Sequence, residues 1–220
     1  RMGYGWSKSV GGFTYQDAYD LHAKADFHVV DTLFSSLALV GQDPLMTSDD
    51  RFKLLIPPNF LTGLSGTATP TPAVLHLARR DAEQSAKVQR AGGLLAIGTD
   101  TPLVAPGIAL QTNLRAAGMV TSNHQALQNV TINAAKMSRV EQDLGTVEVG
   151  KLADLVIVRG NPLQNLKAAA AVEYVVKNGV SLSLAEILAP FRTSVALGER
   201  RKAVIAYDRM CRADPHDCAE

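Results

Sequence analysis

The sequence predicts an α/β fold with parallel strands, and three observations support this prediction. Stretches with helical spacing of apolar residues alternate along the chain with short apolar runs, of which "HVV" and "LLAIG" are the clearest. These runs lack the polar and apolar alternation of a half-exposed strand, which is typical of strands buried on both faces. Each run also ends close to an aspartate, and α/β folds carry their reactive groups at the carboxyl ends of strands.

The first helix and strand occupy the segment that begins at residue 14. The stretch "TYQDAYDLHAKA" (14–25) has helical periodicity, with Thr14 as a candidate N-cap. The following "DFHVVDTLF" is rich in β-branched and aromatic residues, which favour a strand. We expect this strand to end at Asp31 and Thr32.

A long irregular segment follows at residues 41–72. It contains five prolines and the run "TGLSGTATPTP". Loops of this length in a compact fold are usually binding loops or lids. We therefore expect residues 41–72 to form a lid or a binding loop.

The second helix and strand repeat the same order. Residues 72–90 predict a helix with Pro72 in its first turn, where proline is tolerated, and with Gly92 and Gly93 just beyond its end. The strand "LLAIG" and Asp100 come next. Two further helices are predicted at 108–117 and 122–138, the second with Ser122 as its N-cap.

The type of secondary structure that the sequence predicts changes near residue 140 and again near residue 184. Residues 1–140 form the predicted α/β part. Residues 141–183 predict short strands and a hairpin at Asn178-Gly179, so they form a small accessory β region. Residues 184–220 predict a helix to about Met210, broken at Pro190, and a polar tail.

Composition excludes several classes of function. The 220 residues are 46% hydrophobic and carry a formal net charge of +1, so the chain has no field that would gather nucleic acid. Its apolar stretches are too short or too interrupted to cross a membrane. Cys211 and Cys218 close only a local loop and, with His216, offer too few ligands for a zinc site. The sequence does not indicate a cellular compartment.

An ordered series of motifs resembles a known family. "GTDTP", then "ALQNVTINAAKMSRVEQDLGTVEVGKLADLVIVRGNPL", then "VEYVVKNG" are similar to the C-terminal third of the amidohydrolase superfamily, nearest to its imidazolonepropionase-like and dipeptidase-like branches. The stretch "TYQDAYDLHAKADFHVVDTL" is similar to the helix and strand before the seventh barrel loop of those enzymes. The resemblance runs from about residue 14 to residue 190.

The resemblance implies a metal-dependent hydrolase. Its fold would be the C-terminal portion of a (β/α)8 TIM-type barrel with a small β-sandwich, and its substrate a small molecule whose C–N bond is cleaved, such as a cyclic amide, an N-acyl group or a dipeptide. Asp100 matches the aspartate after the eighth strand, which binds metal and takes the proton of the attacking water. Zinc is the expected metal, as one or two ions. Asp31, Thr32 and Thr101 would contact the substrate.

The sequence also departs from the family pattern. The other metal ligands, mostly histidines that follow earlier strands, are absent, and none of the histidines present has ligand spacing: His22, His28, His76, His124 and His216. A catalytic zinc site needs about three protein ligands. The segment alone should therefore be inactive. Family members often carry His and Glu at the positions of Gln111 and Asn113, so we do not expect this helix to give the family's usual polar support or substrate contact.

Two interpretations of this departure stay open. In the first, the rest of the barrel comes from sequence upstream of Arg1 or from another chain, or a homo-oligomer forms. In the second, the segment is a non-catalytic interaction module that uses its uncovered strand edges to bind a partner.

Overall fold

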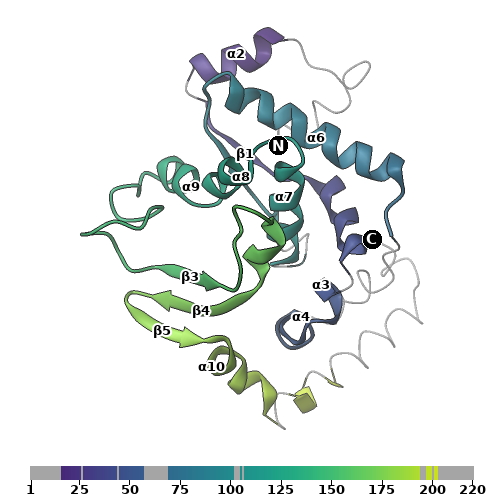
Figure 1. Ribbon diagram of the computed structural model, residues 1–220, viewed down its shortest axis with the longest axis vertical. Helices are drawn as coiled ribbons and strands as arrows, with labels where there is room; N and C mark the ends of the chain where they lie inside the picture. Colours follow the sequence, from purple (N-terminus) through teal and green to yellow (C-terminus); the bar gives the residue numbers. More distant parts are fainter. Residues whose placement is uncertain are drawn as a thin grey trace.

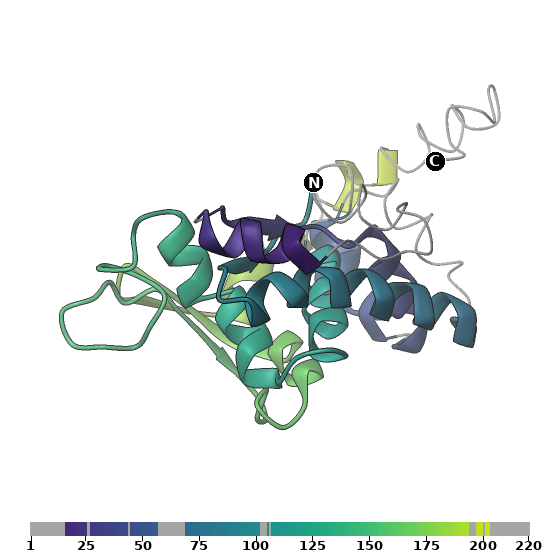
Figure 2. The ribbon, with the colours of Figure 1, turned by 90° about the horizontal axis from the view of Figure 1, so that it is seen from above.

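The computed structural model describes residues 16–25, 27–43, 45–56, 69–101, 105, 107–193, 197–199 and 201–202. Helices pack around a short parallel pair of strands, and a separate antiparallel sheet lies beside them (Figure 1). Seen from above, the antiparallel sheet extends away from the helical layer (Figure 2). The predicted α/β class is confirmed by this mixed arrangement.

Two helix–strand pairs form the first part of the chain, as predicted. Helix α2 (Gln16–Lys24) precedes β1 (Val29–Asp31), and α6 (Pro72–Arg90) precedes β2 (Leu95–Ile97). The strands pair in parallel with Val29 opposite Leu95 and Asp31 opposite Ile97. Tyr19, Val29, Val88 and Leu95 form one buried cluster between the helices and the strands. Both helices therefore cover the same face of the strand pair.

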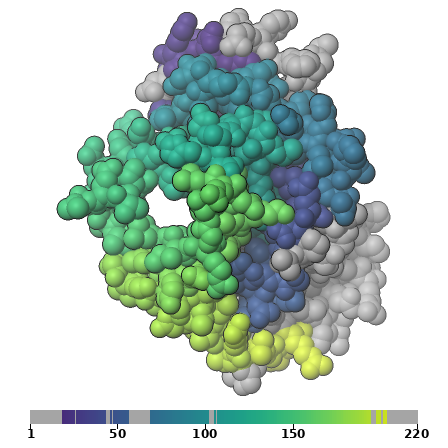
Figure 3. Space-filling model, viewed as in Figure 1, coloured from purple at the N-terminus to yellow at the C-terminus, as the bar shows by residue number. Residues whose placement is uncertain are grey.

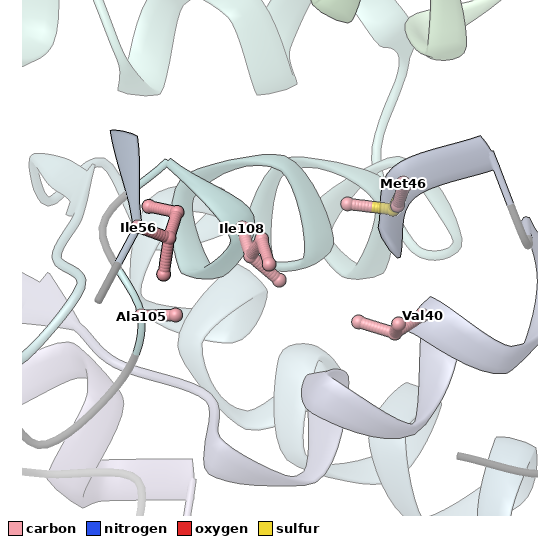
Figure 4. Packing of buried hydrophobic residues seen from close by; sticks show 5 residues of the cluster. All are labelled: Val40, Met46, Ile56, Ala105 and Ile108. Carbon is pink, nitrogen blue, oxygen red and sulfur yellow. The ribbon is translucent and has the colours of Figure 1, made fainter. Parts of the chain in front are cut away.

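The prediction of an irregular loop at residues 41–72 is wrong for the described residues up to 56, which are largely helical. Three short helices follow β1: η2 (Phe34–Gln42), α3 (Leu45–Ser48) and α4 (Asp50–Leu55). Val40, Met46 and Ile56 pack against Ala105 and Ile108 (Figure 4). The Asp49 carboxylate caps α4 by accepting a hydrogen bond from the Arg51 amide at 2.8 Å. Residues 57–68 of the predicted loop lie outside the described residues.

The later helices agree with the prediction in part. Thr71 caps α6 as its hydroxyl accepts from the Val74 amide at 3.4 Å, and α7 (Ile108–Gly118) follows. The single helix expected at 122–138 is instead two, α8 (Asn123–Asn129) and α9 (Ile132–Met137). Ser122 caps α8 in a capping box with Gln125. The break falls at Val130 and Thr131, where Thr131 leaves helical geometry with φ −128° and ψ −100°.

The predicted accessory strands are present and form one antiparallel sheet. Its strands are β3 (Leu155–Val158), β4 (Val172–Lys177) and β5 (Val180–Ser183), and η3 (Leu166–Ala170) connects the first two. Asn178 (φ 51°) and Gly179 (φ 80°) make the predicted two-residue turn. Within the described residues this region is a single layer, so the second layer of the expected sandwich stays a prediction.

The predicted C-terminal helix is interrupted at Pro190, as expected. Helix α10 (Leu184–Leu188) passes into η4 (Ala189–Arg192), which contains Pro190, and the described residues 197–199 and 201–202 are again helical. A proline inside a helix removes a hydrogen bond and clashes with the preceding turn, which explains the interruption. Residues 203–210 of the predicted helix lie outside the described residues. Cys211, His216 and Cys218 lie outside the described residues. No helix in the described ranges is long and apolar enough to span a membrane.

Candidate functional site

The carboxyl ends of β1 and β2 lie at the same edge of the parallel pair. The Gly98 amide, directly after β2, donates a hydrogen bond to the carbonyl oxygen of Asp31 at 2.7 Å, so the pairing continues to the strand ends. Asp31 is the last residue of β1 and Thr32 follows it, and Asp100 and Thr101 follow β2. The four residues predicted as site residues are therefore carried by two adjacent strand ends.

Gly98 allows the two strand ends to approach closely. A Cβ atom at this position would lie 2.8 Å from the Thr32 hydroxyl oxygen and 2.9 Å from a methyl group of Val30. No side chain fits at such distances. Thr32 thus packs against the backbone of the segment that leads to Asp100.

Asp100 occupies an unusual backbone conformation. Its φ of 52° lies in the left-handed region, which aspartate tolerates better than most residues other than glycine. The hydroxyl groups of Thr99 and Thr101 lie 3.1 Å apart on either side of it. Asp100 is half-buried and Thr101 is exposed.

The Asp31 side chain lies on the face of β1 that α6 covers. It is 5% exposed and lies under α6, where it hydrogen-bonds to Ser85. Burial raises the pKa of the Asp31 carboxyl to about 6, and the nearby Asp81 raises it further, against the hydrogen bonds from Ser85 and the Thr32 backbone. One carboxyl oxygen has no hydrogen-bond partner among the described residues. A substrate contact by Asp31 would require its carboxyl to leave this position.

A small cavity adjoins the Asp31 carboxyl. Its volume is about 10 Å³, about the space that one water molecule needs. Asp31, Ser85 and Asn113 are among its polar lining residues, and Ala82, Leu95 and Ile97 are among its apolar ones. A substrate would not fit there.

Asn113 on α7 provides polar support at a position where the departure from the family pattern gave no reason to expect it. It is 3% exposed, and its amide oxygen accepts a hydrogen bond from the Leu33 backbone amide at 2.7 Å. Its amide nitrogen donates to the carbonyl oxygens of Ala109 at 2.8 Å and Gly98 at 3.4 Å. The sequence signal that could have indicated this is the polar run Gln111-Thr112-Asn113 between apolar residues of the helix.

The described residues do not fit a complete metal site. No group of three or more His, Cys, Asp or Glu side chains in the described ranges could hold an ion. His22, His76 and His124 lie on α2, α6 and α8. Asp100 can supply one oxygen ligand, which zinc accepts, but the other ligands of a catalytic zinc would have to come from elsewhere.

A larger open groove lies between α4, β4 and α10. Its volume is about 240 Å³. Each arginine on its wall has an acidic partner: Arg51 binds Asp49, Arg159 binds Glu173 at 2.7 Å, and Arg192 binds Asp50 at 3.4 Å. Because these charges neutralise one another, the strand ends are the better candidate for chemistry.

Comparison with known proteins points to one family. The model of the amidohydrolase family matches residues 69–182, which is 114 of the 220 residues and includes β2 and Asp100. No curated protein matches the chain.

Solved structures agree on the fold. A prolidase complexed with N-methylphosphonate-L-proline has a TM-score of 0.54 and 22% identity, over 82% of this chain and 43% of that chain. A Xaa-Pro dipeptidase with methionine in its active site has a TM-score of 0.50 and 26% identity, over 76% and 37%. A further structure, described as an amidohydrolase, has a TM-score of 0.51 and 20% identity, over 78% and 38%. The chain thus spans about two fifths of the length of these structures.

Proposed function

The chain belongs to the amidohydrolase family, and from this premise we propose that it forms the C-terminal portion of a metal-dependent hydrolase that cleaves C–N bonds. The observation that carries the proposal is the position of Asp100. It follows β2 inside the segment that the family model matches, at the edge of a parallel strand pair where such folds place their chemistry. The resemblance to a prolidase and a Xaa-Pro dipeptidase favours dipeptides over other C–N substrates.

In this proposal Asp100 has two roles. Its carboxylate contributes one ligand to a divalent metal, expected to be zinc, and accepts a proton from the attacking water. The bound metal would supply Lewis-acid activation when present. Asp100 is half-buried and the neighbouring Thr101 is exposed.

The threonines are proposed to contact the substrate. Thr32 and Thr101 flank the strand ends and each carries a hydroxyl group that can donate or accept a hydrogen bond. Asp31 would join them only after its carboxyl left its contact with Ser85 under α6. We therefore assign substrate positioning chiefly to the threonines.

The proposed site needs residues outside the described part of the chain. Apolar side chains at the strand pair are uncovered, with Val30 55% exposed and Phe27 62% exposed. Val147 and Val149, between α9 and β3, are also exposed, and Figure 3 shows an opening beside this segment. We propose that these surfaces receive the rest of a TIM-type barrel and the second layer of a β-sandwich, from upstream sequence or another chain.

Zinc content and hydrolysis together test the proposal. The chain is recovered with any polypeptide that copurifies, and zinc and the hydrolysis of a Xaa-Pro dipeptide are measured for the wild type, Asp100→Asn and the exposed control Asp143→Asn. Asp100→Asn should lower kcat/KM by roughly 100-fold or more and reduce the zinc content, because it removes the proton acceptor and a ligand. Asp143→Asn should change neither.

The alternative is a non-catalytic interaction module. The specific observation in its favour is that the described residues gather no group of three metal ligands. A metal-free homo-oligomer in the same purification, without hydrolysis, would favour the module over the enzyme.

A further inference from the structure

A single side chain on α7 connects the ends of both parallel strands. Asn113 accepts a hydrogen bond from the amide of Leu33, two residues after the end of β1, at 2.7 Å. It donates to the carbonyl oxygen of Gly98, the residue after β2, at 3.4 Å. A second donation, to the carbonyl oxygen of Ala109 at 2.8 Å, holds the amide group in this orientation.

The chemistry of asparagine suits this connection. A carboxamide offers an acceptor oxygen and two donor hydrogens, and here both atoms have backbone partners. At 3% exposure, the Asn113 side chain is shielded from bulk water. Removal of a buried partner leaves the other group unsatisfied, which costs more than the hydrogen bond itself contributes.

The two connected residues are close in sequence to the proposed site. Leu33 directly follows Thr32, and Gly98 precedes Asp100 by two residues. Gly98 also donates its amide to Asp31 and packs against the Thr32 hydroxyl, so a shift at Gly98 moves both strand ends. The orientation of the Asn113 amide therefore bears on both Thr32 and Asp100.

We propose that Asn113 is a positioning residue, which fixes Thr32 and Asp100 relative to one another by holding the two strand ends. This rests on the proposed function, in which Asp100 binds metal and Thr32 contacts the substrate. Asn113 itself touches neither metal nor substrate. Its side chain acts through the backbone of Leu33 and Gly98.

Three variants separate the two connections. Asn113→Leu keeps a similar shape but removes both hydrogen bonds. Asn113→Asp keeps an acceptor for the Leu33 amide but removes the donors to Gly98 and Ala109. The matched control is Asn129→Leu, because Asn129 is a fully buried asparagine on α8 that contacts Gln89 and Asn133 near the opposite end of β2.

Nuclear magnetic resonance of the chain gives the readouts. Asn113→Leu should raise amide exchange at Leu33 by about tenfold or more and shift the Gly98 carbonyl carbon. Asn113→Asp should shift the Gly98 carbonyl while Leu33 stays protected. Asn129→Leu should leave both signals as in the wild type. Because the aspartate variant retains one connection, it keeps the test valid if the leucine variant fails to fold.

A paramagnetic metal distinguishes this inference from the function on which it rests. With millimolar Mn²⁺ added to the chain and any polypeptide that copurifies with it, which would supply the other ligands, the amides of residues 99–101 should broaden in the wild type and in Asn129→Leu, and less in Asn113→Leu. Unchanged signals at Leu33 and Gly98 in a folded Asn113→Leu variant would overturn the positioning role. The expected exchange pattern without broadening at Asp100 in the wild type would instead count against the metal role and leave the connection standing.

Discussion

The carboxyl group of Asp31 lies against the Ser85 hydroxyl beneath α6, although its position at the end of a strand suggested a role at the open edge. Its pKa is raised from 3.8 to about 6, chiefly by burial. The folded protein therefore binds this proton more tightly than the unfolded chain does. The resulting stabilisation is complete below pH 3.8 and is lost as the pH rises through about 6.

Replacement of Asp31 by asparagine removes this pH dependence. At pH 8 the variant should be more stable than the wild type by up to about 3 kcal/mol, and the difference should vanish near pH 4. Urea unfolding of both proteins between pH 4 and pH 8 measures it. Ser85→Ala should move the wild-type transition to higher pH, because it removes a hydrogen bond that favours the charged form. Parallel pH profiles for the wild type and Asp31→Asn would contradict this account.

An added methyl group at Gly98 should separate the strand ends. The Cβ of Gly98→Ala would meet the Thr32 hydroxyl oxygen at 2.8 Å and a Val30 methyl group at 2.9 Å. Overpacking of this kind costs about 1 to 3 kcal/mol. The control is Gly198→Ala, where nothing lies within 4 Å of the added atom. Equal free energies of unfolding for the two variants in urea would show that the strand ends are not closely packed.

The sequence predicted correctly those helices and turns whose ends are marked by capping residues, proline or glycine. Helix α6 starts at Thr71 and Pro72 and is followed by glycines, and the β4–β5 hairpin turns at Asn178-Gly179. In each case, residues within a few positions of one another determine the geometry. This is why periodicity and capping residues sufficed.

The helices at 34–55 depend on contacts that are distant in sequence. Val40, Met46 and Ile56 are too widely spaced to show a helical pattern, and they become a core only against Ala105 and Ile108. Pro44 and the proline-rich stretch beyond it favoured a loop instead. No local signal reports such a long-range contact.

The candidate site was predicted at the level of strand ends but not of side-chain direction. Along β1, Val29 and Asp31 are buried and Val30 is exposed. Which of the two faces meets the helices depends on packing against α2 and α6. The sequence thus located Asp31 and Asp100 at one edge, but it could not show that the Asp31 carboxyl faces Ser85.

The β4–β5 hairpin should respond to the backbone preference at Asn178. With φ at 51°, Asn178→Ala should lose about 1 kcal/mol of unfolding free energy, because a Cβ-bearing residue without a compensating polar group is disfavoured there. Asn178→Gly should stay within a few tenths of a kcal/mol. The hydrogen bond from the Asn178 amide to Asp154 at 2.7 Å survives in both variants and so does not confuse the comparison. Equal losses for the two variants in urea unfolding would contradict the backbone explanation.

The uncovered face of β1 should be the surface through which the chain binds a partner polypeptide or a second copy of itself. Val30 is 55% exposed on the face away from α2 and α6, and a strand pair this short is not stable in water unless its faces are covered. Val30→Lys should weaken binding of the chain to its partner polypeptide or to itself by about tenfold or more, because a charge would be buried without a partner. Sedimentation velocity measures this against the 23.5 kDa mass of the single chain. The control is Leu21→Lys on α2, which is 64% exposed on the helical side and should leave association unchanged. A wild-type chain that sediments alone at all concentrations, or equal effects of the two lysines, would show that this face is not the interface.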